Sequence, residues 1–515
     1  MSRLDVAFVN PNSSRAVYQG LADDYSAIET PTWSLLLAQS CRSKGNSVAI
    51  LDADAERLSP SAAAQKIEEL NPRLICIVVY GQNPNSGTTN MASASELAIE
   101  LKRRGVKTPI GLIGSHVQAL PLETLNRERA VDIGFLNEGA HSLWELLALD
   151  DIADARKRLD VPGLCVRDRG FARMTGAPKL VTQERMDIDL PGYAWDLLPY
   201  RARPLDMYRS HFWHAEYDNA KRTPFAALYT SLGCRFRCHF CMINVLNRND
   251  EAEIGVASDY AGMRYWSPEL IVNEFDKLVD MGVETLRISD EMFLLNRRYY
   301  APLCEMLAQR GYGDKLRMWA YSRIDTINRE EDLRLIRSAG IRWLALGIES
   351  ANRTVRLEAS KGKFKDVDIA DVVRKVHAAD IRVMANYMFG LPGDTYETMQ
   401  QTLDLSLELC TLGWNAYAAM ALPGSPLYRD AVASGVELPS SYEGYSFHSY
   451  DARPLPTETL TPADVLRFRD DAFHAYHSDS SFLERIEREF GPQARLNIER
   501  MIGIRLKRRL LEVST

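Results

Sequence analysis

The sequence lacks any long run of apolar residues. No stretch approaches the ~18 consecutive apolar side chains that a helix needs to cross a bilayer. The opening residues, MSRLDVAFVNPN, pass from a short apolar segment straight into a turn. They carry neither the apolar core nor the small-residue cleavage site of a secretory leader. We therefore expect a cytoplasmic protein with no membrane partner.

Positive charge is not in excess either. Lysine and arginine number 62 against 69 aspartate and glutamate, which gives a net charge of −7. Nucleic-acid-binding proteins normally present a basic face, so this balance argues against a nucleic-acid partner. Apolar residues at 46% and charged residues at 25% are usual for a globular chain. A chain of 515 residues exceeds a single ordinary core, and we expect two or three domains.

Cysteine is scarce, yet three of the eight cysteines lie close together. Cys234, Cys238 and Cys241 have the spacing C-x3-C-x2-C. In a reducing compartment such a group indicates metal or redox chemistry rather than disulfides. A structural zinc site needs a fourth ligand, usually from a second C-x2-C pair, and the sequence contains no such pair. The other five are interpreted as buried small side chains: Cys41, Cys76, Cys165, Cys304 and Cys410.

Residues 1–155 alternate between strand-like and helix-like segments, with strands expected over 4–10, 47–53, 74–80, 109–115 and 131–137. Apolar strands separated by amphipathic helices are typical of a Rossmann-like, doubly wound parallel sheet. Such a sheet binds ligands beyond the carboxyl ends of its strands. Polar loops occupy those ends here, with the sequences NPNSS (10–14), YGQNPNSG (80–87), GSHVQALP (114–121) and NEGAH (137–141).

The rest of the chain divides into three segments. Residues 156–224 are rich in Arg and Pro and are predicted to connect the domains by packing across both. Residues 225–435 contain six strand–helix units, which predict a partial TIM-type (β/α)6 barrel with its site at the strand carboxyl ends. Residues 436–515 are predicted to form a small helical C-terminal domain. The predicted fold class is therefore α/β with two sheets.

The cysteine group follows the first strand of the predicted barrel, where such a fold places its chemistry. Three thiolates on a [4Fe–4S] cluster leave one iron open to a small molecule. With Phe240 before the third cysteine, the motif resembles that of the radical S-adenosylmethionine (SAM) superfamily. The resemblance implies that Cys234, Cys238 and Cys241 bind the cluster and that its open iron chelates SAM. It also implies an external one-electron reductant of the flavodoxin or ferredoxin type, whose electron splits SAM into methionine and a 5′-deoxyadenosyl radical.

Five later strand ends also resemble SAM-binding segments of this superfamily. They read RISDEMF (287–293), AYSRID (320–325), LGIES (346–350), ANYMFGLPGDT (385–395) and ALPGSPLY (421–428). An acid in the first suits the SAM amino group, because an ammonium beside a carboxylate gains a charge-assisted hydrogen bond. The alternative is that one of these acids only caps the following turn. The implied SAM contacts are Phe240, Ser289, Asp290, Glu291, Tyr321, Ser322, Arg323, Glu349, Ser350, Asn386 (where the superfamily usually has glycine), Gly390, Leu391 and Pro392.

Three segments of the first domain resemble the cobalamin-binding domain found in one class of radical SAM enzymes. They are ETPTWSLLLAQSCRSKGNSVAILDA (29–53), IGLIGSHVQALP (110–121) and VDIGFLNEGAHSLWELL (131–147). The chain departs from the family pattern at Thr32, Ser115 and Asn137. The implied cobalamin contacts are Asn10, Pro11, Asn12, Thr30, Pro31, Tyr80, Gly81, Gln82, Asn83, Gly114, Ser115, His116, Glu138 and Gly139.

A dinucleotide is the alternative ligand for such a sheet. It would need the pattern G-x-G-x-x-G after the first strand, and the segment there reads NPNSSRAVYQG. The same segment contains no histidine, so we expect no axial histidine from this loop on cobalt. A weakly ligated lower face favours cobalt that cycles through cob(I)alamin.

The whole pattern resembles the cobalamin-dependent radical SAM methyltransferases, with a [4Fe–4S] cluster, SAM and cobalamin as cofactors. In that class a substrate carbon radical takes a methyl group from methylcobalamin. We therefore predict methylation of an unactivated sp3 carbon in a small metabolite, such as a sugar or natural-product intermediate. The alternative within the class is cyclisation, ring contraction, oxidation or rearrangement without methylation. Outside the class stand methylthiolation of RNA or a ribosomal protein, which normally needs a second cluster, and non-catalytic carriage of a cofactor.

Overall fold

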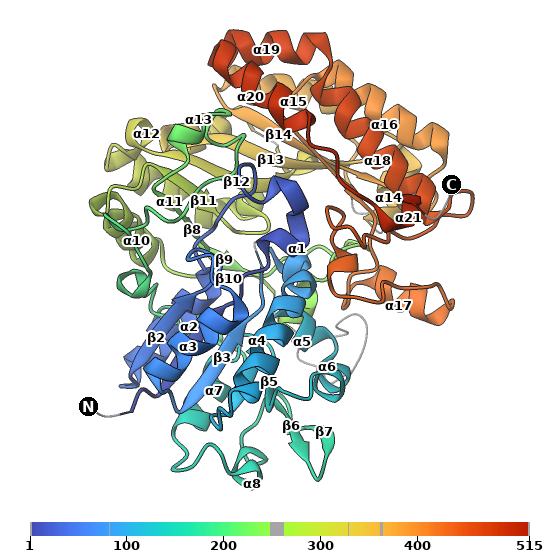
Figure 1. The fold of residues 1–515 in the computed structure, drawn as a ribbon. Helices are drawn as coiled ribbons and strands as arrows, with labels where there is room; N and C mark the ends of the chain where they lie inside the picture. The colour runs from blue at the N-terminus through green and yellow to red at the C-terminus, as the bar shows by residue number, and fades with distance from the viewer. Residues whose placement is uncertain (1–2, 82, 248–261, 328, 361–363, 513–515) are drawn as a thin grey trace.

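The computed structural model describes residues 3–81, 83–247, 262–327, 329–360 and 364–512. Two units, each built on one sheet, are joined by a long segment, and C-terminal helices lie across the second unit (Figure 1). This arrangement confirms the α/β fold class predicted from the sequence. Within the described ranges no helix is long and apolar enough to span a bilayer.

The first sheet has the strand order β2-β1-β3-β4-β5-β6-β7. Its first five strands are parallel and correspond to those predicted from the sequence. β3 is buried along its whole length, because helices cover both faces of the sheet. The strand bounds are Val6–Asn10 for β1, Val48–Asp52 for β2, Leu74–Val78 for β3, Ile110–Ile113 for β4 and Ile133–Phe135 for β5.

Alternate side chains of β3 belong to two different cores, as the two-residue repeat of a strand requires. Cys76 packs on the side that carries α2 and α7, and Ile75 packs on the side that carries α3 and α4. The helices therefore lie in pairs on opposite faces of the sheet. Their bounds are Thr32–Ser43 for α2, Pro60–Leu70 for α3, Met91–Arg103 for α4 and Ala140–Leu147 for α7.

An antiparallel hairpin extends this sheet beyond β5, and the sequence analysis missed it. Strands β6 (Leu164–Asp168) and β7 (Phe171–Met174) lie within the segment predicted to be an irregular connection. Arg169 and Gly170 form the turn with φ of 49° and 91°, a two-residue geometry that matches strand twist. The apolar alternation that would reveal β7 is weak, since Phe171 at its start is 76% exposed.

The second sheet contains six parallel strands in the order β15-β14-β13-β12-β11-β8. It is an open, partial barrel, as the six strand–helix units predicted. The strand bounds are Phe225–Leu228 for β8, Thr285–Ile288 for β11, Arg317–Arg323 for β12, Ile341–Glu349 for β13, Arg382–Phe389 for β14 and Gly413–Ala418 for β15. A two-stranded antiparallel pair, β9 (Ser231–Leu232) and β10 (Arg264–Tyr265), flanks the cysteine loop.

Helices follow the barrel strands in turn. The longer ones are Pro268–Asp280 (α10), Arg297–Gln309 (α11), Glu330–Ser338 (α13), Ile369–Ala378 (α15) and Tyr396–Leu409 (α16). The shorter helices of the whole chain are Ser14–Tyr18 (α1), Ser115–Ala119 (α5), Pro121–Arg127 (α6), Ala155–Arg158 (α8), Met186–Asp189 (α9), Tyr312–Lys315 (α12), Arg353–Ala359 (α14) and Pro426–Ala433 (α17).

The C-terminal helices cover the open edge of the barrel and share its core. α18 packs against β14, β15 and α16, and Phe468 and Tyr476 of this helix belong to the main hydrophobic cluster. Gly390 after β14 touches the same helix: a Cβ there would lie 2.5 Å from Val465. The helix bounds are Pro462–His477 for α18, Ser480–Phe490 for α19, Pro492–Ile502 for α20 and Arg509–Glu512 for α21.

A buried ion pair joins the two units on one side of their interface. Glu138, which follows β5, receives two hydrogen bonds from the Arg264 guanidinium at 2.9 and 2.8 Å. Both side chains are at least 95% buried. Such a pair contributes little net stability, but the removal of one partner leaves a desolvated charge without compensation.

We expect Glu138→Ala to destabilise the protein by about 3–5 kcal/mol, because the buried charge of Arg264 would lose its carboxylate partner. The measurement is the denaturation midpoint followed by tryptophan fluorescence. Glu145→Ala is the matched control, since Glu145 forms an exposed pair with Lys179 and should change the midpoint little. Equal midpoints for the two variants would contradict the assignment.

Candidate cofactor and active site

The cysteine loop begins directly after β9. Gly233 turns the chain into the loop with φ of 92°, a conformation that residues with a Cβ rarely adopt. His239 anchors the middle of the loop: its N–H donates to the Ala359 carbonyl at 2.8 Å, and its carbonyl accepts from Leu427 at 3.0 Å. The ring of His239 pairs with Asp430 at 2.9 Å. The imidazole is therefore used to hold the loop in place.

Each cysteine sulfur accepts a hydrogen bond from nitrogen. The donors are the main chain of Phe236 for Cys234, the guanidinium of Arg323 for Cys238, and the main chain of Ile243 for Cys241. The amide of Asn85, from the first unit, also lies 3.8 Å from the Cys241 sulfur. Donors aimed at every sulfur stabilise thiolates, which are the form that binds metal.

Burial raises the pKa of Cys234 to about 12 and that of Cys238 to about 11. The free thiols therefore hold their protons at neutral pH and would release them to a metal. Among the described residues no three His, Cys, Asp or Glu side chains are close enough to hold a single ion. In an iron–sulfur cube each thiolate binds a different corner, so the ligands stand further apart than around one ion. Three thiol ligands with nitrogen donors at their sulfurs fit the ligand set of an iron–sulfur cluster.

The two acids after β11 have different roles. Asp290 accepts hydrogen bonds of 2.6 Å from the Thr230 N–H, the Thr230 hydroxyl and the Ser231 hydroxyl. Its carboxylate therefore fixes the start of the cysteine loop, a role that differs from the capping of the following turn considered from the sequence. Glu291 is half-buried, and burial raises its pKa to about 7 against the opposing effect of Arg287. A cation such as an ammonium beside Glu291 would favour the ionised carboxylate.

Arg323 at the end of β12 links the cysteine loop to the barrel. Its guanidinium makes a bidentate pair with Asp325 at 2.6 and 2.8 Å. The same group lies over the ring of Phe236, 3.8 Å from its centroid, and donates to Cys238. These contacts hold the guanidinium of Arg323 beside the cysteine loop, so its positive charge lies next to Cys238.

The end of β13 is strained and carries an acid. The register with β14 shifts between Gly347 and Glu349, and Glu349 has φ of 66°. A Cβ at Gly347 would lie 2.5 Å from the Glu349 carboxylate, so glycine leaves room for that group. Burial raises the pKa of Glu349 to about 7. Backbone strain that the surroundings hold in place is common at functional sites.

Ser322 and Ser350 are satisfied within the protein. Ser322 bonds to the Thr326 hydroxyl at 2.7 Å, and Ser350 lies 3.3 Å from the Thr402 hydroxyl. The Ser350 hydroxyl also accepts from the Asn352 N–H. Their side chains therefore help to hold the two strand ends in place.

Asn386, which replaces the usual glycine, belongs to a polar network inside the barrel. Its side-chain oxygen lies 3.4 Å from the Tyr417 hydroxyl, and Asn415 donates to that hydroxyl at 2.7 Å. A further hydrogen bond connects Tyr417 with Tyr321 on β12. Asn415, Tyr417 and Tyr321 are half-buried, so water-accessible surface remains beside the network. The sequence analysis missed Asn415 and Tyr417, because strand alternation alone does not separate them from packing residues.

An apolar wall borders this space near the cysteines. Phe240 packs with Leu391 and Met388, which come from the end of β14. Leu391 is fully buried, and Pro392 follows it on the surface side of the turn with partial exposure. Phe240 and Leu391 therefore form one continuous apolar surface beside the cluster loop.

Several residues predicted to bind a ligand in the first unit are used within the protein. Asn10 donates to Asp52 at 2.7 Å, and Asn12 donates to the Leu58 carbonyl at 3.1 Å. Burial lowers the pKa of His116 to about 3, and its Nδ1 lies 3.1 Å from the Thr88 hydroxyl. Glu138 is committed to Arg264, as described above. These contacts position the loops, while Asn10 and Asn12 also line the cavities at this edge of the sheet.

The remaining predicted residues lie at the carboxyl ends of the first sheet. Tyr80 stacks on Trp33 at 4.3 Å and donates to the Asn137 carbonyl at 3.0 Å. Gln82 lies outside the described residues. The others are Pro11 in the loop after β1, Thr30 and Pro31 before α2, Gly81 and Asn83 after β3, Gly114 and Ser115 after β4, and Gly139 at the start of α7.

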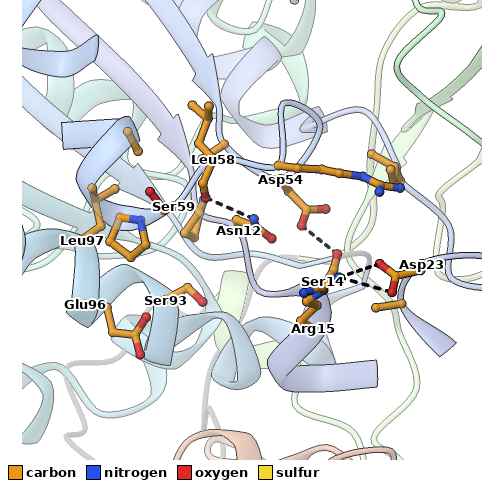
Figure 2. Close-up of a pocket in the computed structure, with 17 residues that line it drawn as sticks. Asn12, Ser14, Arg15, Asp23, Asp54, Leu58, Ser59, Ser93, Glu96 and Leu97 are labelled. Carbon is orange, nitrogen blue, oxygen red and sulfur yellow. Dashed lines mark hydrogen bonds and ion pairs between the residues drawn. The ribbon is translucent and has the colours of Figure 1, made fainter. Parts of the chain in front are cut away.

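Two adjoining cavities open at this edge. The larger, about 430 Å³, is lined by polar and charged side chains such as Ser14, Asp54 and Glu96, with Ser14 bonded to Asp54 at 2.7 Å (Figure 2). The smaller, about 90 Å³, shares Pro11, Ser14 and Asp54 with it. The smaller cavity is lined by both units, since Trp33 and Tyr80 meet Tyr229 and Ser289 from the ends of barrel strands.

Three serine hydroxyls around the smaller cavity are buried without a hydrogen-bond partner in the part of the chain described. They belong to Ser13, Ser34 and Ser289, which are 6%, 0% and 3% exposed. An unsatisfied buried hydroxyl costs about 1–3 kcal/mol, so three around one cavity indicate a polar ligand. The sequence analysis missed Ser13 and Ser34, because isolated serines carry no motif.

Comparisons with known proteins identify both units. The model of the radical SAM superfamily matches residues 228–406, and the model of the B12-binding domain matches residues 19–147. An uncharacterized methyltransferase of Pyrococcus horikoshii is 24% identical over 417 residues, covering 81% of this chain and 82% of that protein. The anaerobic magnesium-protoporphyrin IX monomethyl ester cyclase of Cereibacter sphaeroides is 23% identical, covering 90% and 68%.

Solved structures share the whole fold. The radical S-adenosylmethionine methyltransferase TsrM from Kitasatospora setae, solved with cobalamin and a [4Fe–4S] cluster, superposes with a TM-score of 0.66 at 17% identity. The superposition covers 98% of this chain and 99% of TsrM. The cobalamin-dependent radical enzyme OxsB gives a TM-score of 0.65 at 14% identity, over 97% of this chain and 70% of OxsB. The two domain matches confirm the predicted cofactors: a [4Fe–4S] cluster, SAM and cobalamin.

We expect replacement of Cys234, Cys238 or Cys241 by alanine to abolish cluster assembly, because a cube held by two thiolates loses a ligand. Iron and sulfide content after anaerobic reconstitution measures this, together with the visible absorbance. Cys410→Ala is the control, since that half-buried cysteine ends α16 far from the loop. A full iron content in any of the three loop variants would exclude that cysteine as a ligand.

Proposed function

The chain is a radical SAM enzyme with a B12-binding domain, and we propose that it methylates an unactivated sp3 carbon of a small metabolite. One observation carries the proposal: the cavity between the units is lined by strand ends of both sheets. A ligand of the first unit and a ligand of the barrel would therefore face the same space. When bound, the cluster with SAM supplies a hydrogen-abstracting radical, and cobalamin supplies the methyl group.

We assign the cluster to Cys234, Cys238 and Cys241, with Arg323 and main-chain N–H groups holding the thiolates. Glu291 is the carboxylate that would pair with the SAM ammonium, because Asp290 is already saturated by Thr230 and Ser231. Phe240 and Leu391 would border the adenine, and Glu349 would accept from the ribose hydroxyls. The electron would come from an external flavodoxin- or ferredoxin-type reductant.

The cobalamin site would lie over the stacked pair Trp33 and Tyr80, beside the three unpartnered serine hydroxyls. The corrin ring carries amide side chains, which can donate to or accept from those hydroxyls. The adjoining cavity of about 430 Å³ offers polar partners for a part of the ligand that the smaller cavity cannot hold. The loop after β1 carries Ser13 and Ser14 but no histidine, so we expect no axial histidine from it.

A substrate would enter the space beside the polar network of the barrel. Tyr321, Asn415 and Tyr417 keep accessible surface there, and the rings of Tyr18 and His448 contact one another with centroids 5.3 Å apart. Arg287 is paired with Glu29 at 2.7 Å, so its charge is already neutralised. Hydroxyls, amides and aromatic faces suit a neutral, hydroxylated small molecule better than a phosphate ester.

We expect the reconstituted enzyme to transfer a labelled methyl group from CD3-SAM to a neutral small-molecule substrate. 5′-Deoxyadenosine and S-adenosylhomocysteine should form together, because the reaction consumes SAM in two ways. Mass spectrometry of the products measures both, and the Cys238→Ala variant should form neither methylated product nor 5′-deoxyadenosine.

The second candidate is radical chemistry without methylation, favoured by the cyclase among the relatives. It would yield 5′-deoxyadenosine without S-adenosylhomocysteine. That product pattern, with no labelled methyl group in any product, would reject methylation and support cyclisation, oxidation or rearrangement.

Ser289 distinguishes the two cofactor sites. The sequence resemblance assigns it to SAM, whereas its hydroxyl lines the cavity next to Trp33 and Tyr80. We expect Ser289→Ala to weaken cobalamin binding about 2- to 10-fold by the loss of one hydrogen bond. SAM affinity should stay unchanged, and the cofactor-free protein should not be less stable, because the hydroxyl has no partner there.

Equilibrium binding of hydroxocobalamin and of SAM measures the two affinities. Ser43→Ala is the control, since that hydroxyl donates to the Ser40 carbonyl within α2. Weaker SAM binding with normal cobalamin binding would show that Ser289 contacts SAM and not cobalamin.

A further inference from the structure

One loop of the first unit reaches both candidate cofactor sites. It comprises residues 80–81 and 83–87 and is called the bridging loop below. Tyr80, Gly81 and Ser86 line the smaller cavity between the units. Asn85, in the same loop, contacts the cysteine loop of the barrel. These contacts lie only a few residues apart in sequence. A ligand bound at Tyr80 or Ser86 would therefore be close to Asn85.

The orientation of the Asn85 amide is fixed by its surroundings. Its side-chain oxygen accepts the N–H of Met242 at 3.1 Å, which only an oxygen can do. The side-chain nitrogen must therefore be the atom that faces the Cys241 sulfur, at 3.8 Å. The side-chain amide of Asn85 thus contacts both Cys241 and the next residue, Met242. It is a contact between units, since Asn85 and Cys241 are 156 residues apart in the chain.

The bridging loop is internally braced. The Ser86 hydroxyl donates to the Asn83 carbonyl at 2.8 Å and accepts the Asn83 N–H at 3.2 Å. Gly81 has φ of 72°, and a Cβ there would collide with the Ser86 hydroxyl oxygen. Tyr80 is held by its stack on Trp33. Because the loop has these internal bonds, a displacement at Tyr80 or Ser86 is carried to Asn85.

A hydrogen bond to a cluster ligand changes the energetics of electron uptake. Reduction adds negative charge to the sulfur atoms, so an N–H donor aimed at a ligating thiolate favours the reduced cluster. The donors to Cys234 and Cys238 come from the barrel itself, whereas Asn85 comes from the unit that would hold cobalamin. Asn85 is therefore the donor whose position depends on how the two units meet.

We propose that Asn85 is a positioning residue that sets the reduction potential of the cluster and couples it to cobalamin binding through the bridging loop. The inference rests on the proposed function, because it needs the cluster on Cys241 and cobalamin at the inter-unit cavity. Cobalamin contact with Tyr80, Gly81 and Ser86 would hold the amide at the sulfur. The cluster would then accept its electron most readily when the second cofactor is in place.

The simpler explanation is that Asn85 only holds the bridging loop against the cysteine loop, through its hydrogen bond with the Met242 N–H. Asn85→Asp separates the two roles, since aspartate keeps the oxygen that accepts from Met242 and removes the N–H that faces Cys241. Asn85→Ala removes both contacts. Asn126→Asp is the control, because it adds the same charge at an exposed position of α6 in the first unit and leaves the Asn85 amide in place.

The experiment is a redox titration of the [4Fe–4S]2+/+ couple in the full-length reconstituted protein, followed by the EPR signal of the reduced cluster. It is performed with and without bound cobalamin. We compare the ratio of reduced to oxidised cluster at one fixed solution potential. In both Asn85 variants we expect this ratio to fall about two- to fivefold, which is the effect of one weak hydrogen bond. Cobalamin should raise the ratio in the wild type and Asn126→Asp proteins but not in the Asn85 variants.

The outcomes separate the inference from the proposed function. No cluster signal in the wild type would reject the cluster assignment itself. A normal cluster whose potential is the same in wild type and both Asn85 variants would overturn the role of Asn85. An equal shift in Asn126→Asp and Asn85→Asp would show a general charge effect and would also overturn it. If the reduction potential of the wild-type cluster is the same with and without cobalamin, the coupling is overturned.

Discussion

The hydroxyl of Thr30 accepts the N–H of Ala227 at 2.9 Å and donates to the carbonyl of the same residue at 3.1 Å. This pair of bonds ties the segment before α2 to the first barrel strand. The neighbouring Glu29 pairs with Arg287 on β11, although burial alone would oppose its charge. The two sheets are thereby held with their carboxyl edges toward one space. The shared cavity, the bridging loop and the placement of Ser289 all depend on this contact.

The electrostatics of the site follow from this contact between the two units. Nitrogen donors point at all three cysteine sulfurs, while the nearby acids Glu291 and Glu349 have pKa values raised by burial to about 7. Burial thus favours protonated thiols and acids, and a cationic partner would favour their ionisation. In the proposed function, a metal cluster and the ammonium of SAM would supply positive charge at the cysteines and at Glu291. Among the described residues, three buried serine hydroxyls without a hydrogen-bond partner line the cavity between the units.

The sequence predicted the features that repeat or carry a motif. The two parallel sheets, the six barrel strands and the cysteine loop follow from alternation and spacing within short windows. It could not predict Asn85 against Cys241 or Glu29 against Arg287, because these pairs are 156 and 258 residues apart and neither carries a pattern. Nor could it show which matching side chains are also hydrogen-bonded within the protein. Asp290 and Glu138 lie at family-like positions, yet their carboxylates serve the fold.

The central claim is that both cofactors face one cavity between the units. Pulsed EPR on the protein loaded with a reduced cluster and cob(II)alamin tests it most directly, because two paramagnets that face one cavity interact through their dipoles. We predict a resolved dipolar coupling between the cluster and cobalt that disappears in Cys234→Ala. Spectra that are the simple sum of two isolated centres would contradict the account.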